Sequence, residues 1–179
     1  MTDEQLRNSS RSGFSAAVVI PTAEIPFDFS FRKYCEENTC GEFGKNHGCP
    51  PTCGTPEELR DLILGKSHAL VLQTVWDIAD FSDTYALTEA KNAHSVRMLQ
   101  LAAILERTAP KPILVGAGPC IVCPRCRALD GEPCCDMEHR MLSMSACCVH
   151  VKALAEKCGM PYEWKPGRIY YFGMYVYNK

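Results

Sequence analysis

The sequence has no long apolar run and no large excess of charge of one sign. Its 19 Lys and Arg residues against 21 Asp and Glu residues give a formal net charge of -2. Such a chain has no strong field that would attract nucleic acid or an anionic membrane surface. No segment approaches the ~20 consecutive apolar residues that a membrane span needs. We therefore expect neither a nucleic-acid partner nor a membrane partner.

The N-terminal segment also lacks the apolar core of a secretory signal. It begins polar and charged, and its apolar run at residues 16–20 is far shorter than a signal-peptide core. We expect residues 1–14 to be flexible and the protein to be cytoplasmic. A chain of 179 residues, 46% of them hydrophobic, can bury one continuous core, which predicts a single domain over residues 1–179.

Common catalytic and nucleotide-binding motifs are missing too. There is no P-loop and no Ser-His-Asp order, and Gly116-Ala117-Gly118 lacks the rest of a dinucleotide-binding fingerprint. The C-x3-C-x2-C pattern associated with radical S-adenosylmethionine enzymes is also missing from the sequence. No catalytic residue is predicted, and whether the protein is an enzyme stays open.

Cysteine, in contrast, is abundant, with twelve residues. In a reducing cytosol, thiolate ligands or catalytic thiols are expected more often than disulfides. Cys147, Cys148 and Cys158 fall on the apolar stripe of a predicted helix, which favours small buried packing residues over ligands. His94, on another apolar helical stripe, is interpreted as a core histidine.

Patterning predicts a layered α/β fold. Apolar runs predict strands at residues 16–20, 68–76, 111–115 and 168–177, and helical periodicity predicts helices at 55–64, 84–107 and 143–158. Thr55 and Pro56 supply an N-cap hydroxyl and a first-turn proline. Strands that alternate with helices favour a mostly parallel sheet of about four strands with helices packed on it, carrying two cysteine-rich metal-binding loops.

The second of these loops has the more regular cysteine spacing. Its first three cysteines follow C-x2-C-x2-C, and the fourth comes after a gap of seven residues: Cys120, Cys123, Cys126 and Cys134. This spacing resembles the ferredoxin run and favours an iron-sulfur cubane, whereas zinc ribbons more often use two separated C-x2-C pairs. Zinc remains the alternative, and Cys135 could replace Cys134 as a ligand.

The first loop holds four cysteines with gaps of four, eight and three residues: Cys35, Cys40, Cys49 and Cys53. The spacing matches no common zinc or ferredoxin pattern. Four thiols within one loop rich in Gly and Pro still predict a second metal site. His47 could add a ligand, although a single histidine in a polar loop is more often a surface residue.

Several segments together resemble an uncharacterised family of cysteine-rich, predicted metal-binding proteins common in anaerobes. They are "NTCGEFGKNHGCPP", "GTPEEL", "GAGPCIVCPRC", "GEPC", "LSMSACCVHV" and "YYFGMYVY". The resemblance places Cys35, Cys40 and Cys49 in a first motif and the four cysteines from Cys120 to Cys134 in a second. Cys53, Cys135, Cys148 and His47 stand where that family usually has other residue types. The resemblance implies metal binding and no defined reaction.

Three functions remain open from the sequence. The leading hypothesis is an iron-sulfur protein with one or two [4Fe-4S] clusters that carries electrons or serves as a redox accessory subunit for a partner protein. The second is an enzyme that uses an open iron of a three-cysteine site on a small molecule. The third is an interaction module in which zinc fixes the loops. A pocket beside Cys49 would favour the enzyme over the carrier.

Overall fold

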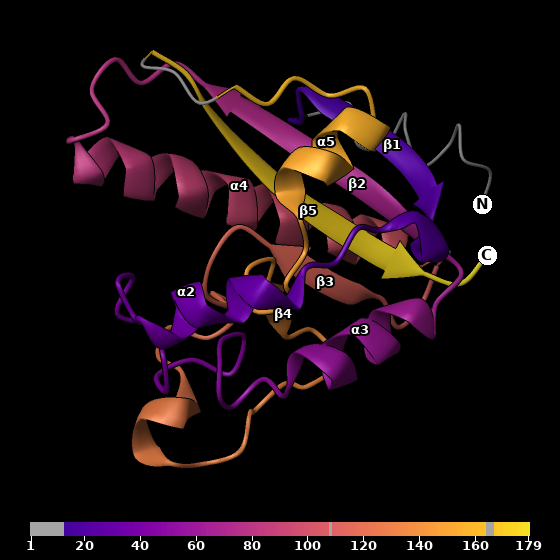
Figure 1. Cartoon of the computed structure of the whole chain (residues 1–179). Helices are drawn as coiled ribbons and strands as arrows, with labels where there is room; N and C mark the ends of the chain where they lie inside the picture. The colour runs from indigo at the N-terminus through magenta and orange to yellow at the C-terminus, as the bar shows by residue number, and fades with distance from the viewer. Residues whose placement is uncertain (1–12, 108, 164–166) are drawn as a thin grey trace.

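The structure is a computed structural model that describes residues 13–107, 109–163 and 167–179, and a five-stranded sheet forms its centre (Figure 1). The strands, in their order across the sheet, are β1 (Ala16–Pro21), β2 (His68–Trp76), β5 (Ile169–Tyr177), β3 (Ile113–Gly116) and β4 (Met141–Ser143). Four predicted strands are present, and β4 is an addition.

The predicted parallel character of the sheet is wrong. β5 lies between β2 and β3 and runs antiparallel to both, and β1 pairs antiparallel with β2. β3 and β4 form a parallel pair. The expectation failed because alternation of strands and helices fixes strand direction only when the crossover joins neighbouring strands. Here the strand that follows α5 enters between two strands formed earlier in the chain.

In the described part of the chain, four α-helices accompany the sheet: α2 (Arg32–Glu36), α3 (Pro56–Leu64), α4 (Thr84–Leu105) and α5 (Val151–Lys157). The predicted start of α3 is confirmed. The Thr55 hydroxyl accepts from the Glu58 amide at 3.2 Å, and the Glu58 carboxylate accepts from the Thr55 amide at 2.8 Å. This capping box satisfies two backbone donors that the first helical turn leaves unpaired. None of the helices among the described residues combines the length and apolar character required to cross a membrane.

The core has one layer on each face of the sheet. α4 lies along one face, where Met98, Leu101 and Leu105 pack with apolar residues of β2 and β5 (Figure 1). α5 covers the opposite face through Leu154 and Ala155. Gly173 in β5 permits the close approach of α4, since a Cβ there would lie 2.7 Å from the Met98 sulfur.

His94 belongs to this core, as predicted. Its side chain is buried, and Nδ1 lies 2.9 Å from the Thr74 hydroxyl. Burial disfavours the charged imidazolium and lowers the pKa of His94 to about 4. Phe14 packs edge-on against the His94 ring. The predicted flexible segment 1–14 therefore ends in an ordered residue, while residues 1–12 lie outside the described part of the chain.

The predicted helix at residues 143–158 is wrong in its first half. Residues 141–143 form β4, the chain then turns, and α5 begins only at Val151. Cys147 and Cys148 are buried, as expected, but in this turn, and Cys158 is half-buried. Nearly all residues from 141 to 149 are buried, whichever way their side chains point. The spacing of the apolar positions therefore does not distinguish a helix from a strand followed by a turn.

Candidate metal centre

Both cysteine loops lie at the end of the sheet where the parallel strands finish (Figure 1). β3 ends at Gly116 and leads directly into the second loop, which returns to the sheet as β4. The Ser143 amide donates to the Gly48 carbonyl at 2.8 Å, which ties the first loop to the end of β4. In α/β sheets, ligands commonly bind outside the carboxyl ends of parallel strands.

The first loop places two of its four thiols inside the protein and two near its surface. Cys49 and Cys53 are buried, Cys35 is half-buried on α2, and Cys40 is exposed. Desolvation raises the pKa of Cys49 to about 12, with further contributions from Glu42 and the other three thiols of the loop. Such a thiol stays protonated unless a bound cation offsets the negative charge.

Arg32 supplies positive charge next to Cys53. Its guanidinium is held by the Gly54 carbonyl at 2.9 Å and the Ala146 carbonyl at 3.3 Å. Desolvation raises the pKa of Cys53, and the nearby Arg32 opposes that shift. The sequence indicated no role for Arg32, because no regular spacing relates it to the cysteines.

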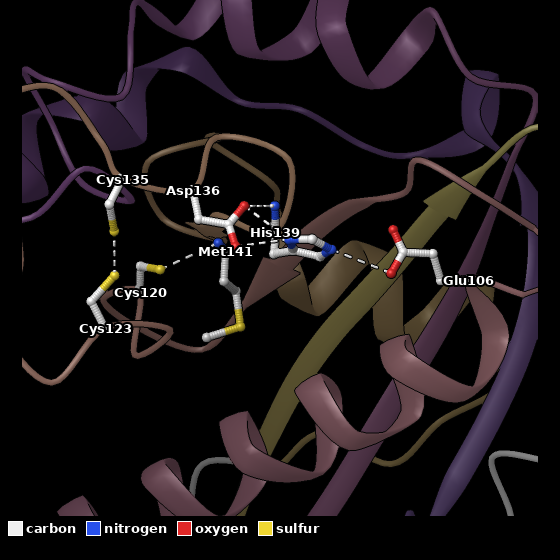
Figure 2. A network of polar contacts seen from close by, with 7 residues as sticks. All are labelled: Glu106, Cys120, Cys123, Cys135, Asp136, His139 and Met141. Atoms are coloured by element: carbon white, nitrogen blue, oxygen red, sulfur yellow. Dashed lines mark hydrogen bonds and ion pairs between the residues drawn. The ribbon is translucent and has the colours of Figure 1, made fainter.

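The second loop supports two of its thiols with backbone donors. The Met141 amide lies 3.4 Å from the Cys120 sulfur, and the His47 amide lies 3.3 Å from the Cys126 sulfur (Figure 2 shows the first contact). Hydrogen bonds from N–H groups to sulfur stabilise the thiolate, which is the form that ligates metals. A small pocket is lined by all five thiols of the loop: Cys120, Cys123, Cys126, Cys134 and Cys135.

Cys135 lies next to a predicted ligand. Figure 2 shows its sulfur facing that of Cys123, and the two sulfur atoms are 2.7 Å apart. The contact with Cys135 disfavours ionisation of Cys123 and raises the pKa of Cys123 to about 11. The structure therefore brings Cys135 together with the four predicted ligands of this loop and does not turn it away from them.

Residues 46–49 connect the two loops. The Asn46 side chain donates to the Cys120 carbonyl at 3.0 Å and accepts from the Cys120 amide at 3.1 Å. The same side-chain oxygen accepts from the Gly48 amide at 2.9 Å. Asn46 is buried, so its amide replaces water for three backbone groups. Cys49 of the first loop thus follows, by three residues along the chain, the asparagine that contacts the Cys120 backbone of the second loop.

Gly48 makes this close contact sterically possible. A Cβ at this position would lie 2.3 Å from the Met141 carbonyl oxygen and 3.1 Å from the Cys120 Cβ. Sequence reasoning missed both Asn46 and Gly48. The available signal was an asparagine two residues before a glycine, an arrangement in which the asparagine side chain often accepts from that backbone amide.

His47 turns toward the second loop and not toward the first. Its Nε2 lies 2.8 Å from the Glu132 carbonyl oxygen, and the ring borders the small pocket of the second loop. The position does not favour the role considered from the sequence, a fourth donor beside Cys35, Cys40 and Cys49. The His47 backbone amide, which contacts Cys126, has the clearer link to a thiol.

A polar network fastens the far side of the second loop to α4. His139 lies 2.8 Å from the Asp136 carboxylate and 3.3 Å from the Glu106 carboxylate, as drawn in Figure 2. Both carboxylates favour the imidazolium and raise the pKa of His139, Asp136 making the larger contribution. Because Glu106 directly follows α4, this contact couples the loop that carries Cys134 to the end of that helix.

A larger pocket of about 510 Å³ opens beside the first loop. Three of that loop's cysteines line it, Cys35, Cys40 and Cys49, whereas Cys53 does not. The other walls come from the ends of β3 and β4, from α4 and from the aromatic start of β5. The volume falls within the range of pockets that hold small molecules in proteins.

The chemistry of the donor set fits a thiolate-bound metal group. Both loops offer several thiols to one region, and two thiols already accept backbone N–H groups. Thiolates are ligands of zinc and of iron-sulfur clusters alike. Across residues 13–107, 109–163 and 167–179, no three His, Cys, Asp or Glu side chains are grouped for a single metal ion.

Fold and cysteine loops together define a cysteine-rich protein of the α/β class. The model of the DUF2284 family, described as predicted metal-binding proteins, matches residues 18–176, so the chain belongs to that family. This match confirms the resemblance seen in the cysteine motifs. No curated protein and no solved structure matches the chain.

Proposed function

We propose that the protein is an iron-sulfur redox protein with a [4Fe-4S] cluster at each cysteine loop, and that the first-loop cluster acts on a small molecule. The observation that carries this proposal is the pocket of about 510 Å³ with Cys35, Cys40 and Cys49 in its wall. A pure electron carrier needs no such space beside its cluster. An enzyme needs it to admit a substrate.

The ligands are assigned by loop. Cys120, Cys123, Cys126 and Cys134 hold the second-loop cluster, and Cys35, Cys40 and Cys49 hold the first-loop cluster. When bound, such clusters supply one-electron chemistry, and an iron without a cysteine ligand also acts as a Lewis acid. The chain contributes burial at Cys49, backbone N–H groups at Cys120 and Cys126, and a mostly apolar pocket wall.

Passage of electrons between the loops is supported by the segment from Asn46 to Cys49. This segment ends at the first-loop ligand Cys49. Its Asn46 side chain contacts the backbone of Cys120, and its His47 amide contacts the sulfur of Cys126. The second loop in turn has exposed apolar side chains, with Leu129 48% exposed and Met137 59% exposed. These side chains suit contact with a redox partner protein, which would deliver electrons to the second-loop cluster.

A second candidate, the closed electron carrier, is favoured by Cys53. This thiol is buried, and it adds to the electrostatic effects that raise the pKa values of Cys35 and Cys49. If Cys53 completes the first ligand set, no iron is left open to the pocket. Replacement by alanine separates the two cases: loss of the first-loop cluster supports the carrier, and full retention supports the enzyme.

Anaerobic purification tests the proposal directly. Iron, zinc and acid-labile sulfide are counted per chain, and visible absorption is recorded before and after dithionite. Two cubanes require about eight iron and eight sulfide per chain, by the stoichiometry of the cluster type. Cys49→Ser and Cys123→Ser should each remove at least half of both. A colourless protein that keeps stoichiometric zinc after anaerobic iron-sulfide reconstitution would identify the zinc interaction module instead.

A further inference from the structure

The large pocket is lined by aromatic side chains as well as by the cysteines of the first loop. The aromatic wall is made by side chains of β5 and of the segment before it, with Tyr162, Tyr170 and Phe172 on the face of the sheet that α5 covers and Tyr171 on the face that α4 covers. Tyr162 packs edge-on against Phe172 at a centroid distance of 5.7 Å and against Tyr170 at 6.3 Å. Phe172 is only 3% exposed, so the half-buried rings of Tyr162 and Tyr170 present the apolar surface, which favours a planar, conjugated ligand.

This wall is accessible because of the sheet topology. β2 pairs with all nine residues of β5, but β3 reaches only from Met174 to Val176. The first part of β5 is thus not paired with β3, and its aromatic side chains border the pocket. The Tyr171 hydroxyl donates to the Leu87 carbonyl of α4 at 2.8 Å, which fixes this ring against the helix.

Lys91 on α4 adds a positive charge to the pocket lining. It follows Leu87 by one helical turn on α4, so it lies on the same side of the helix as the Tyr171 contact. Its stem covers Gly118, where an added Cβ would be 3.1 Å from the lysine Cδ. Lys91 is half-buried, and its ammonium group makes no ion pair within the described part of the chain.

Negative groups line the pocket from a different element. Glu37 and Glu42 belong to the first loop, together with the three cysteines of that wall. An anionic group on a ligand is repelled by this wall and attracted by Lys91 on α4. The ligand is therefore oriented, with its acidic group at Lys91 and its apolar body along the tyrosines.

We propose that this pocket binds a planar aromatic or conjugated carboxylate, held by Lys91 and by the aromatic side chains of Tyr162 and Tyr170. The inference rests on the proposed function, because this ligand class is the small molecule that the first-loop site would act on. It names a substrate class and the residues that select it, which the metal site alone does not define.

Calorimetric titration of the anaerobically purified, full-length protein tests the pocket with defined probes. The probes are 2-naphthoate, its uncharged analogue 2-naphthamide, and cyclohexanecarboxylate, which keeps the charge without the planar ring. We expect 2-naphthoate to bind at least tenfold more tightly than either analogue. Lys91→Met should weaken 2-naphthoate by about tenfold, as expected for loss of a hydrogen bond to a charged group, and leave 2-naphthamide unchanged.

Matched variants and metal analysis complete the test. Lys66→Met removes a lysine outside the pocket lining and should leave 2-naphthoate affinity unchanged, whereas Tyr162→Leu should weaken it. The proposal is overturned if 2-naphthoate fails to bind, if 2-naphthamide binds equally well, or if Lys91→Met has no effect. Iron and sulfide are counted in the same samples, so selective binding by protein without a cluster would refute the proposed function and support the pocket.

Discussion

The two cysteine loops use the same residue in contrasting surroundings. The first loop buries two of its four cysteines, with Cys49 and Cys53 each 6% exposed, while Cys35 is half-buried and Cys40 is exposed. The second loop projects between β3 and β4, and its cysteines are half-buried or exposed. The first loop lines the large pocket with three of its cysteines, whereas the second loop carries the exposed side chains of Leu129 and Met137.

The loops meet at residues 46–49, and the largest expected effect is at Gly48. Gly48→Ala should lower the free energy of unfolding by about 3 kcal/mol, the upper part of the range for overpacking, because the new methyl group meets the Met141 carbonyl. Both loops should lose metal together. Urea unfolding and metal content measure this, with Gly65→Ala as a helix-end control. Loss of metal from one loop alone would show that the loops are independent.

Acid should act on both loops equally, through the core beneath them. The pKa of His94 is lowered to about 4 from an ordinary value near 6.5, so the folded protein resists protonation. The corresponding stability is complete above pH 6.5 and falls as the pH drops toward 4, by about 3 kcal/mol in total. Urea unfolding at several pH values measures the loss. His94→Gln should flatten the profile, and an unchanged profile would contradict this origin.

Asn46→Ala should have a smaller and more local effect. It removes the partner of the Cys120 amide and carbonyl, and buried groups without a partner cost about 2 kcal/mol. Amide exchange should increase at Cys120 and in the second loop more than in α3. Equal exchange in both loops would contradict a role for Asn46 in holding the second loop.

The smallest expected effect belongs to the second loop alone and arises from His139. Its pKa is raised in the folded protein, so the contact with Asp136 and Glu106 is complete below the unfolded value near 6.5. The contact weakens as pH rises through the folded pKa. Amide exchange, corrected for its intrinsic pH dependence, should rise around residues 136–140 and not in the first loop. Glu106→Gln should reduce this pH dependence.

Local signals predicted much of the fold. Thr55 and Pro56 reveal a helix start, and the apolar run from His68 to Trp76 predicts β2 over its full length. Strand direction could not be predicted, because pairing of β5 with β2 and β3 depends on contacts between distant segments. β4 was missed since its three residues are too few for a periodic pattern.

The candidate site was likewise predicted only in part from the sequence. Cysteine spacing identified both groups of thiols, because ligation to one centre requires several similar residues close in sequence. Asn46, Gly48 and Arg32 act through contacts with segments far along the chain, and each is a single residue of an ordinary type. The pocket is formed by five separate elements, so no local pattern could reveal it.

The shared segment from Asn46 to Cys49 has a thermodynamic consequence for metal loading. When a group bound at the first loop holds this segment in place, the His47 amide and the Asn46 side chain are already positioned for the second loop. Any increase in affinity at the second site must be matched by an equal increase at the first, because coupling between binding sites is reciprocal. We therefore expect the two sites to fill cooperatively, with half-loaded protein a minor species during reconstitution.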